Sequence, residues 1–310
     1  MQNKVSIIGA GMTGSTTAHW LAEHAVADLV LVDVLEGIPQ GKALDLLEAL
    51  PIIGKDVKLT GSNRFDDTAD SDIIVIAAGL ARKPGMSRDD LLYANAEIVH
   101  TIAKETIQYS PKAIFVVLTN PLDAMAYLTM KVTGIEPHRV VGQAGILDSA
   151  RMRAFVAMEL GVSVENIHCY VLGGHGDEMV PLTHVSNVAG IPLDEVLSPE
   201  KVASIVKRTR KGGGEIIDLL KTGSAYYAPG AAVAQMVEAI LLDRHLIVPC
   251  SVYVNGAYGL KDIFFGVPVQ LGRKGVERVI EYGLTQQEQA ALQKSAKEVL
   301  GSIAKLNLQS

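Results

Sequence analysis

The chain has 310 residues, of which 48% are hydrophobic and 20% are charged, as in an ordinary globular protein. Its 28 Lys and Arg residues against 34 Asp and Glu residues give a net charge of −6, which argues against nucleic-acid and membrane partners, because both require a basic surface. Apolar runs all fall short of the ~18–20 residues of a membrane span, and the two cysteines, Cys169 and Cys250, are too few for a disulfide framework, so we expect a cytoplasmic protein.

The first half of the chain alternates short β-branched runs with helix-like stretches. Six strands are predicted, at Val5–Ile8, Asp28–Val32, Val57–Thr60, Asp72–Ala78, Ala113–Leu118 and Val140–Val141. Helices are expected between them at residues 14–23, 41–50, 89–109 and 122–132. The strands are apolar throughout rather than alternating, which is typical of a parallel sheet covered on both faces. The pattern predicts an α/β fold, with a doubly wound Rossmann sheet of six parallel strands over residues 1–143.

The pattern changes after about residue 142. Helices are predicted at residues 147–159, 200–210, 214–220, 231–242 and 286–304, and strand-like pieces at 251–255, 263–265 and 267–271. We expect a second, α+β domain over residues 144–310 that binds the substrate. Ligand sites tend to lie where two such domains meet.

A glycine-rich segment follows the first predicted strand and leads into a helix. It fits the pattern G-x-G-x-x-G, in which Gly9 permits a tight turn, Gly11 lets the backbone approach a pyrophosphate and Gly14 allows close packing. Asp33 ends the second strand, where a carboxylate accepts hydrogen bonds from the adenosine ribose and repels a 2′-phosphate. The pattern therefore predicts that NAD, rather than NADP, binds at Gly9, Ala10, Gly11, Met12, Thr13, Gly14 and Asp33.

A nicotinamide cofactor needs a protein group that moves a proton while the hydride moves, and His175 is the best candidate. It follows a strand-like run, and the flanking residues Gly173, Gly174 and Gly176 leave room for a substrate. The other histidines lie on predicted helices or at the ends of elements.

Three further groups of polar residues are candidates for the same site. Asp148 and Arg151 share one face of a predicted helix, although this spacing also fits a surface ion pair. Arg82 and Arg88 flank a Pro-Gly turn after the fourth strand, where open α/β sheets bind ligands, although a solvated basic loop has the same composition. Asn120 ends the fifth strand at the same edge of the sheet.

Together these segments resemble the lactate/malate dehydrogenase family, in particular its malate-specific members of the lactate-dehydrogenase-like type. The resemblance rests, in chain order, on GAGMTG, Asp33, ARKPGMSR, TNPLDA, GILDSARMR, GGHGDEMV and TGSAYYAP, and it covers nearly the whole chain. It implies a two-domain fold, NAD as cofactor, no metal, and reversible oxidation of (S)-malate to oxaloacetate. It also implies a cis bond between Asn120 and Pro121, and a homo-oligomer, a tetramer in preference to a dimer.

The resemblance gives each polar candidate a role. His175 is the proton acceptor in malate oxidation, Asp148 binds its other ring nitrogen and Arg151 binds the C1 carboxylate of the substrate. Arg88 polarises the reacting oxygen, and Arg82 fits the second carboxylate of malate, where lactate-specific relatives carry a neutral Gln.

The remaining positions are assigned by the resemblance alone. Those around the cofactor are Asn95, Leu118, Thr119 and Asn120, and those in the substrate pocket include Asn120 and Ser224.

Three alternatives stay open on the sequence. An L-lactate dehydrogenase, or another NAD-dependent 2-hydroxy acid dehydrogenase, would share the catalytic groups, and Arg82 argues against lactate. An NAD-dependent glycosidase would need a metal and a sugar pocket, which the set of Asp148, Arg151 and His175 does not suit. A catalytically silent NAD-binding scaffold would have no use for that set.

Overall fold

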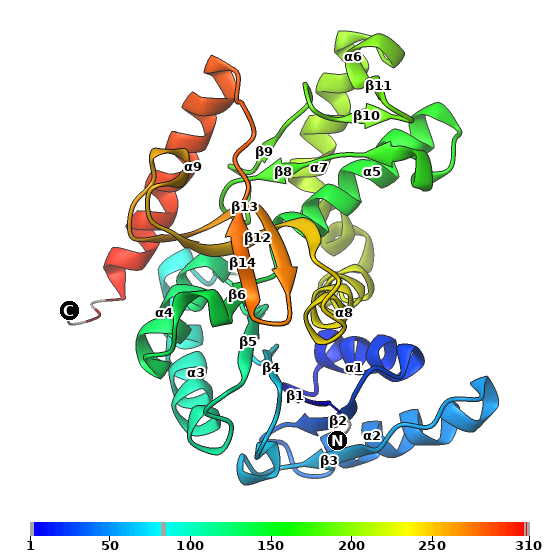
Figure 1. The fold of residues 1–310 in the computed structure, drawn as a ribbon, viewed down its shortest axis with the longest axis vertical. Helices are drawn as coiled ribbons and strands as arrows, with labels where there is room; N and C mark the ends of the chain where they lie inside the picture. Colours follow the sequence, from blue (N-terminus) through cyan, green and yellow to red (C-terminus); the bar gives the residue numbers. More distant parts are fainter. Residues whose placement is uncertain (1–2, 82–84, 307, 309–310) are drawn as a thin grey trace.

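A central sheet runs through the computed structural model, which describes residues 3–81, 85–306 and 308 (Figure 1). Its parallel part consists of β1 (Lys4–Ile8), β2 (Asp28–Val32), β3 (Leu59–Ser62), β4 (Ile73–Ile76), β5 (Ile114–Val117) and β6 (Val140–Gly142). The spatial order β3-β2-β1-β4-β5-β6 is that of a doubly wound dinucleotide-binding sheet. The six parallel strands predicted from the sequence are therefore confirmed, with ends that shift by a few residues.

Three antiparallel strands extend this sheet. They are β12 (Leu246–Val254), β13 (Ile263–Gly272) and β14 (Gly275–Val279). Ser251 of β12 pairs with Gly142 of β6, so the sheet in the described residues has nine strands rather than six. A single sheet thus joins the two halves of the chain.

Helices cover both faces of the parallel strands, as the apolar sequence of those strands predicts. In β4, Val75 packs into the cluster that includes α1 and α8, whereas Ile74 packs into the cluster that includes α3 and α4. Burying one such side chain contributes about 1.5–3 kcal/mol, which makes these two layers the main source of stability in this half. The helices of the first half are α1 (Met12–His24), α2 (Ile38–Ala49), α3 (Arg88–Tyr109) and α4 (Leu122–Thr133).

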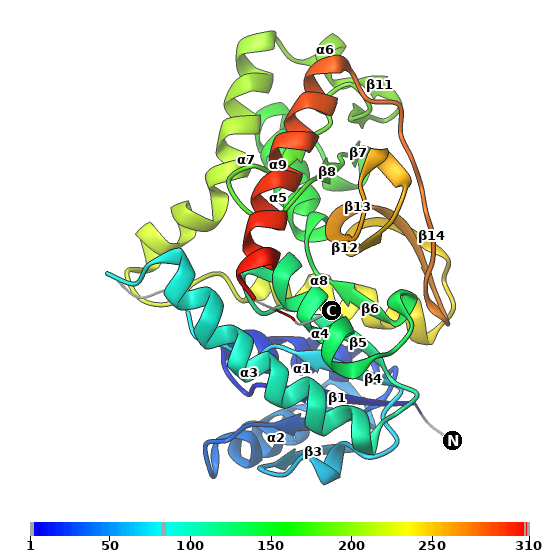
Figure 2. The same ribbon diagram turned by 90° about the vertical axis from the view of Figure 1, so that its left-hand side faces the viewer.

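The second half surrounds β12 and β13, with α9 on one side and α5 and α7 on the other (Figures 1 and 2). Its helices are α5 (Gly145–Leu160), α6 (Leu193–Val196), α7 (Pro199–Leu220), α8 (Tyr227–Leu241) and α9 (Gln286–Lys305). Its short strands are β7 (Ile167–His168), β8 (Val171–Leu172), β9 (Val180–Pro181), β10 (Asn187–Val188) and β11 (Ile191–Pro192). Single 3₁₀ turns lie at Leu50–Ile53, Asp66–Thr68, Pro137–Arg139, Val164–Asn166 and Ala257–Gly259.

Two predicted breaks are absent. The sequence predicts two helices separated at residues 211–213, but α7 is continuous through Gly212, Gly213 and Gly214. It also predicts two strands separated at Gly266, but β13 is continuous there. Within the described ranges, no helix combines the length and the apolar character needed to cross a membrane.

Candidate active site

The glycine-rich loop has the backbone geometry that its sequence predicts. Gly9 has φ = +109°, and a Cβ there would lie 2.5 Å from the backbone nitrogen of Ala78. A Cβ on Gly14 would lie 1.8 Å from the Gly9 carbonyl oxygen, so only glycine permits this contact between helix and strand. A Cβ on Gly11 would meet no protein atom within 4 Å. The loop is therefore closed toward the sheet and open at Gly11, where α1 begins.

Asp33 lies at the end of β2 against this loop. Its Oδ2 accepts a hydrogen bond from the Ala10 backbone N–H at 2.7 Å, and its Oδ1 accepts one from Leu35 at 3.0 Å. A carboxylate has about four acceptor positions, so two remain for ribose hydroxyls. Gly11 is the N-cap of α1 and has no side chain to bond the first N–H groups, which leaves the positive end of the helix dipole free for a phosphate. The residues present thus fit a dinucleotide.

The structure brings His175, Asp148 and Arg151 together. His175 Nδ1 is 2.8 Å from Asp148 Oδ2, and Arg151 Nη1 is 3.1 Å from Asp148 Oδ1. The Asp148 side chain is 2% exposed, that of Arg151 12% and that of His175 17%. Since an ionised carboxylate only accepts hydrogen bonds, Nδ1 of His175 donates and Nε2 of the neutral ring is left as a base. Because Asp148 and Arg151 are buried beside His175, they belong to this site and are not a surface ion pair.

The surroundings of His175 favour its protonated form. Burial is the largest single effect and disfavours the charged imidazolium, whereas the charge of Asp148 and its hydrogen bond favour it. The charge of Asp123 acts in the same direction as Asp148, while that of Arg151 opposes it. The pKa of His175 is therefore raised above its usual value, which suits a group that both takes and returns a proton.

Two cavities meet at His175. One of about 290 Å³ is lined by Arg88, Asn120 and His175, and the other, of about 920 Å³, by Arg151, His175 and residues of α7. Arg88 Nη2 is 3.1 Å from Asp177 Oδ2, which links the first turn of α3 to the loop that carries His175. The Arg88 side chain is 71% exposed and is thus accessible from solvent. Small-molecule sites typically occupy about 300–1,000 Å³, so cavities of this size can hold a small ligand.

Other predicted residues lie around the same edge of the sheet. Asn95 is buried, and its amide binds Leu80 through both its oxygen and its nitrogen and donates to the Asn120 carbonyl at 2.6 Å. Thr119 is buried and its hydroxyl donates to the Ala78 carbonyl, whereas Leu118 is half-buried. The Asn120–Pro121 bond is cis, as the resemblance implies.

One predicted substrate residue is not brought into this arrangement. Ser224 is exposed between α7 and α8 and lines neither of the two cavities. Arg82 lies outside the described residues.

Sequence reasoning missed two residues that contact the site. Asp123 Oδ2 accepts the backbone N–H of His175 at 3.0 Å, and the motif NPLD carries this residue next to Asn120 and Pro121. Gly212 packs against Arg151, since a Cβ there would lie 2.3 Å from Arg151 Cδ. The glycine triplet in α7 was a visible signal for a close backbone approach.

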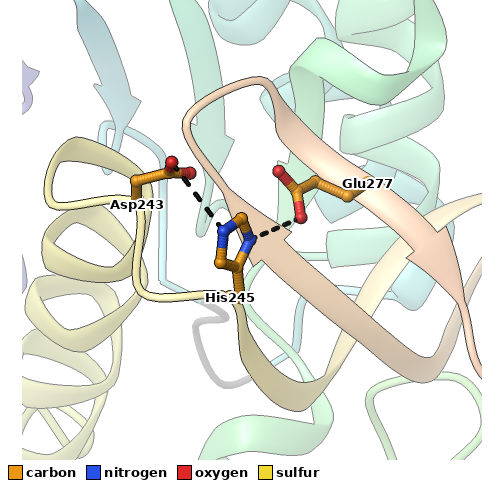
Figure 3. A group of neighbouring side chains, drawn as sticks. All are labelled: Asp243, His245 and Glu277. Atoms are coloured by element: carbon orange, nitrogen blue, oxygen red, sulfur yellow. Dashed lines mark hydrogen bonds and ion pairs between the residues drawn. The ribbon is translucent and has the colours of Figure 1, made fainter.

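A separate group of titratable side chains, Asp243, His245 and Glu277, lies near the start of β12 and on β14 (Figure 3). His245 Nδ1 is 2.8 Å from Glu277 Oε2, and its Nε2 is 3.8 Å from Asp243 Oδ2. The hydrogen bond with Glu277 and the charges of both carboxylates raise the pKa of His245. The two carboxylates face opposite nitrogens of the His245 ring, whereas a single metal ion would bind only one of these nitrogens. We therefore interpret the group as an ion-pair network.

Comparison with known proteins places both halves of the chain in one family. The family model for the lactate/malate dehydrogenase NAD-binding domain matches residues 3–142, and the model for the lactate/malate dehydrogenase α/β C-terminal domain matches residues 146–308. The malate dehydrogenase of Roseiflexus sp. (strain RS-1) is 58% identical over 306 residues, which cover 99% of both chains.

Solved structures agree with this assignment. The crystal structure of Cryptosporidium parvum malate dehydrogenase matches with a TM-score of 0.97 at 41% identity and covers 100% of both chains. The lactate dehydrogenase of the same organism, solved with lactic acid and NAD, matches with a TM-score of 0.96 at 39% identity over 100% of this chain and 99% of that one. The chain therefore belongs to the lactate/malate dehydrogenase family, a family of NAD-dependent oxidoreductases.

Proposed function

We propose that the chain is an NAD-dependent malate dehydrogenase, which interconverts (S)-malate and oxaloacetate. Residues 1–143 hold the cofactor and supply Arg82, Arg88 and Asn120 to the substrate, and residues 144–310 supply Arg151 and His175. The observation that carries the proposal is the buried set of Asp148, His175 and Arg151 at the junction of two cavities. The names of the most similar curated relatives support malate as the substrate.

The cofactor is bound at the glycine-rich loop and Asp33. The open face at Gly11 and the uncapped start of α1 receive the pyrophosphate, and the remaining acceptor positions of Asp33 receive the adenosine ribose. Leu118, Thr119 and Asn120 lie at the carboxyl ends of the strands, where this fold binds its ligands. Asn95 acts there by holding Leu80 and Asn120 in place.

When bound, NAD would supply the acceptor for the hydride on C2 of malate. In the same reaction Nε2 of His175 accepts the proton of the C2 hydroxyl, so that the C2–O bond becomes the carbonyl of oxaloacetate. Asp148 holds the ring with Nδ1 as the donor and stabilises the imidazolium that forms. In the reverse direction the same Nε2 returns the proton.

Three arginines hold and polarise the substrate. Arg151, fixed by Asp148, binds the C1 carboxylate with the forked geometry of its guanidinium. Arg88 stabilises the negative charge that develops on the reacting oxygen. Arg82, assigned from the sequence, binds the second carboxylate, which lactate lacks.

The fold does not choose between malate and lactate, because the lactate dehydrogenase of Cryptosporidium parvum matches as closely as the malate dehydrogenase of that organism. The proposal favours malate because Arg82 occupies the specificity position and because the curated relatives at 52–58% identity are named malate dehydrogenase.

We also propose that the enzyme is a homo-oligomer, a tetramer in preference to a dimer. Exposed apolar side chains on α2 and the turn after it support a partner surface, among them Leu44, Leu47, Ile52 and Ile53. The buried free thiols of Cys169 and Cys250 support a cytoplasmic location.

The proposal is tested by steady-state NADH oxidation with oxaloacetate and with pyruvate, each repeated with NADPH and with a metal chelator. We expect kcat/KM for oxaloacetate to exceed that for pyruvate by at least about 100-fold, since pyruvate lacks the second carboxylate that would pair with Arg82. Loss of activity with chelator would favour a metal-dependent reaction, and absence of any NADH oxidation would favour a scaffold.

The variant Arg82→Gln tests the basis of that preference. We expect the ratio of kcat/KM values to move toward pyruvate, because the second carboxylate of oxaloacetate then loses its charged partner. Lys83→Gln, which removes a neighbouring charge from the same loop, is the matched control and should leave the ratio unchanged. An unchanged ratio in Arg82→Gln would assign specificity to another residue.

A further inference from the structure

His175 is held by hydrogen bonds at two points, its ring and its backbone N–H. Asp148 binds Nδ1 of the side chain, while Asp123 accepts the backbone N–H at 3.0 Å. The two carboxylates come from different elements, Asp148 from α5 and Asp123 from the first turn of α4. His175 thus lies between two acidic groups rather than one.

Asp123 is one of the two buried carboxylic acids among the described residues, the other being Asp148. Asp123 Oδ1 accepts a hydrogen bond from Ser251 Oγ at 2.6 Å, and its Oδ2 accepts the one from His175. Burial raises the pKa of Asp123, against the opposing effect of these two hydrogen bonds. A buried carboxylate costs several kcal/mol unless it is compensated, so a residue of this kind at a catalytic loop calls for an explanation.

The backbone of the loop does not by itself require a carboxylate. The N–H groups that precede His175 use neutral acceptors: Gly173 binds the carbonyl of Gly266 at 2.8 Å, and Gly174 binds Ser295 Oγ at 2.9 Å. A neutral acceptor would hold the backbone N–H of His175 equally well. What distinguishes Asp123 is that it can ionise: burial disfavours its charged form, whereas the charge of His175 favours it, so that the carboxylate and the imidazolium stabilise each other.

We propose that Asp123 is a positioning residue of the proton relay, which fixes the His175 backbone and whose negative charge stabilises the imidazolium. This inference rests on the proposed role of His175. Asp123 lies three residues after Asn120, so the start of α4 ties the position of His175 to that of Asn120.

The other charged groups around His175 affect the protonation of its ring less than the two buried carboxylates do. The charge of Arg151 opposes protonation of His175, while that of Asp148 favours it. Arg88 of α3, Asp177 of the same loop, Glu298 of α9 and Lys207 of α7 line the cavities but are exposed, so water screens them. Asp148 and Asp123 are the buried negative groups that act on the ring in the described part of the chain.

The variant Asp123→Asn removes the charge and keeps both hydrogen bonds, because the amide oxygen accepts from His175 and the amide nitrogen donates to Ser251 Oγ. The His175 ring is titrated by NMR, its signal identified among the eight histidines by its absence in His175→Asn. We expect the proton affinity of His175 to fall about threefold or more. The rate of oxaloacetate reduction declines with rising pH, and the midpoint of that decline should move to lower pH to the same extent as the pKa of His175.

Ser295→Ala is the matched control. It removes the hydrogen-bond acceptor of the neighbouring Gly174 N–H and changes no charge, so a merely structural effect on the loop would appear in it too. We expect its NMR titration to coincide with that of the wild type. The inference is wrong if Asp123→Asn titrates like the wild type, or if Ser295→Ala shifts as far as Asp123→Asn.

Ser251→Ala keeps the inference testable should Asp123→Asn fail to fold. Ser251→Ala removes a hydrogen bond that stabilises the charged form of Asp123. The proton affinity of His175 should therefore fall, but by less than in Asp123→Asn. An unchanged titration in Ser251→Ala would count against the inference. The NMR readout needs no turnover, whereas failure of the proposed function would appear as a lack of oxaloacetate-dependent NADH oxidation in the wild type.

Discussion

The proton state of His175 is set by its neighbours, and the reaction depends on that state. The hydrogen bond from Nδ1 to Asp148 leaves Nε2 as the exchanging position. Burial opposes the charged ring, but the charge of Asp148, its hydrogen bond and the charge of Asp123 together prevail, so the pKa of His175 is raised. A general base of this kind typically contributes ~10²–10⁴ in rate, so other groups must supply the rest.

The raised pKa predicts opposite pH dependences for the two directions. Malate oxidation requires the neutral ring, so its kcat/KM should rise as the pH passes upward through the pKa of His175. Oxaloacetate reduction requires the imidazolium and should fall over the same range. Initial rates in both directions across pH 5–10 measure this, and a shared midpoint at or below the usual ~6.5 of histidine would contradict the geometry.

Arg88 is expected to act on the charge that develops during the reaction rather than on binding alone. Arg88→Gln should lower kcat by about 10²–10³, the range seen when one stabilising donor of this kind is removed. Asp177→Asn removes the exposed partner of Arg88 and keeps the guanidinium, so kcat should change less than about fivefold. Single-turnover kinetics measure both, and a near-normal rate in Arg88→Gln would remove this role.

At the scale of elements, α7 shows what a local pattern leaves out. Three consecutive glycines disfavour a helix by about 1 kcal/mol each relative to alanine, which is why the sequence predicts a break there. The helix continues because Gly212 packs directly on Arg151, a contact between residues 61 positions apart in the chain. The continuity of β13 through Gly266 has the same explanation, because a Cβ at that position would lie 2.3 Å from the Gly173 carbonyl oxygen.

Gly212 therefore determines how closely α7 approaches the substrate-binding arginine. Gly212→Ala should displace the Arg151 side chain and weaken its charge-assisted hydrogen bonds to the substrate, raising KM for oxaloacetate by about 10–100-fold. Gly214→Ala meets no atom within 4 Å and should leave KM unchanged. Both variants gain about 1 kcal/mol in helix propensity, so the difference between them isolates the contact with Arg151. Equal KM values in the two variants would show that the contact has no effect on binding.

The strands and the cofactor loop were predictable because their signals are local. Apolar runs mark the parallel strands, and the glycines at residues 9, 11 and 14 follow one of them directly. Asp123 was not predictable in the same way, because its contact is with a backbone N–H 52 residues away and depends on the path of the loop. β14 was missed because its sequence, GVERV, is half polar and lies at the edge of the sheet.

For the whole molecule, the continuous sheet predicts that the two halves unfold together. β12 pairs with β6, and α1 of the first half packs with α8 of the second in one hydrophobic cluster. Trp20 of α1, the single tryptophan, lies against that cluster and reports on it. We expect urea unfolding followed by Trp20 fluorescence to coincide with unfolding followed by far-ultraviolet circular dichroism. Separate midpoints would show that residues 1–143 and 144–310 are independent units.

The whole account depends on His175 as the group that exchanges a proton with the substrate. The most direct test is the turnover of His175→Asn with oxaloacetate and NADH, measured beside the binding of NADH by its fluorescence. We expect NADH to bind as in the wild type, because the cofactor loop and Asp33 are untouched, and turnover to fall about 10²–10⁴-fold. Turnover near the wild-type rate would contradict the account and assign the proton to another group.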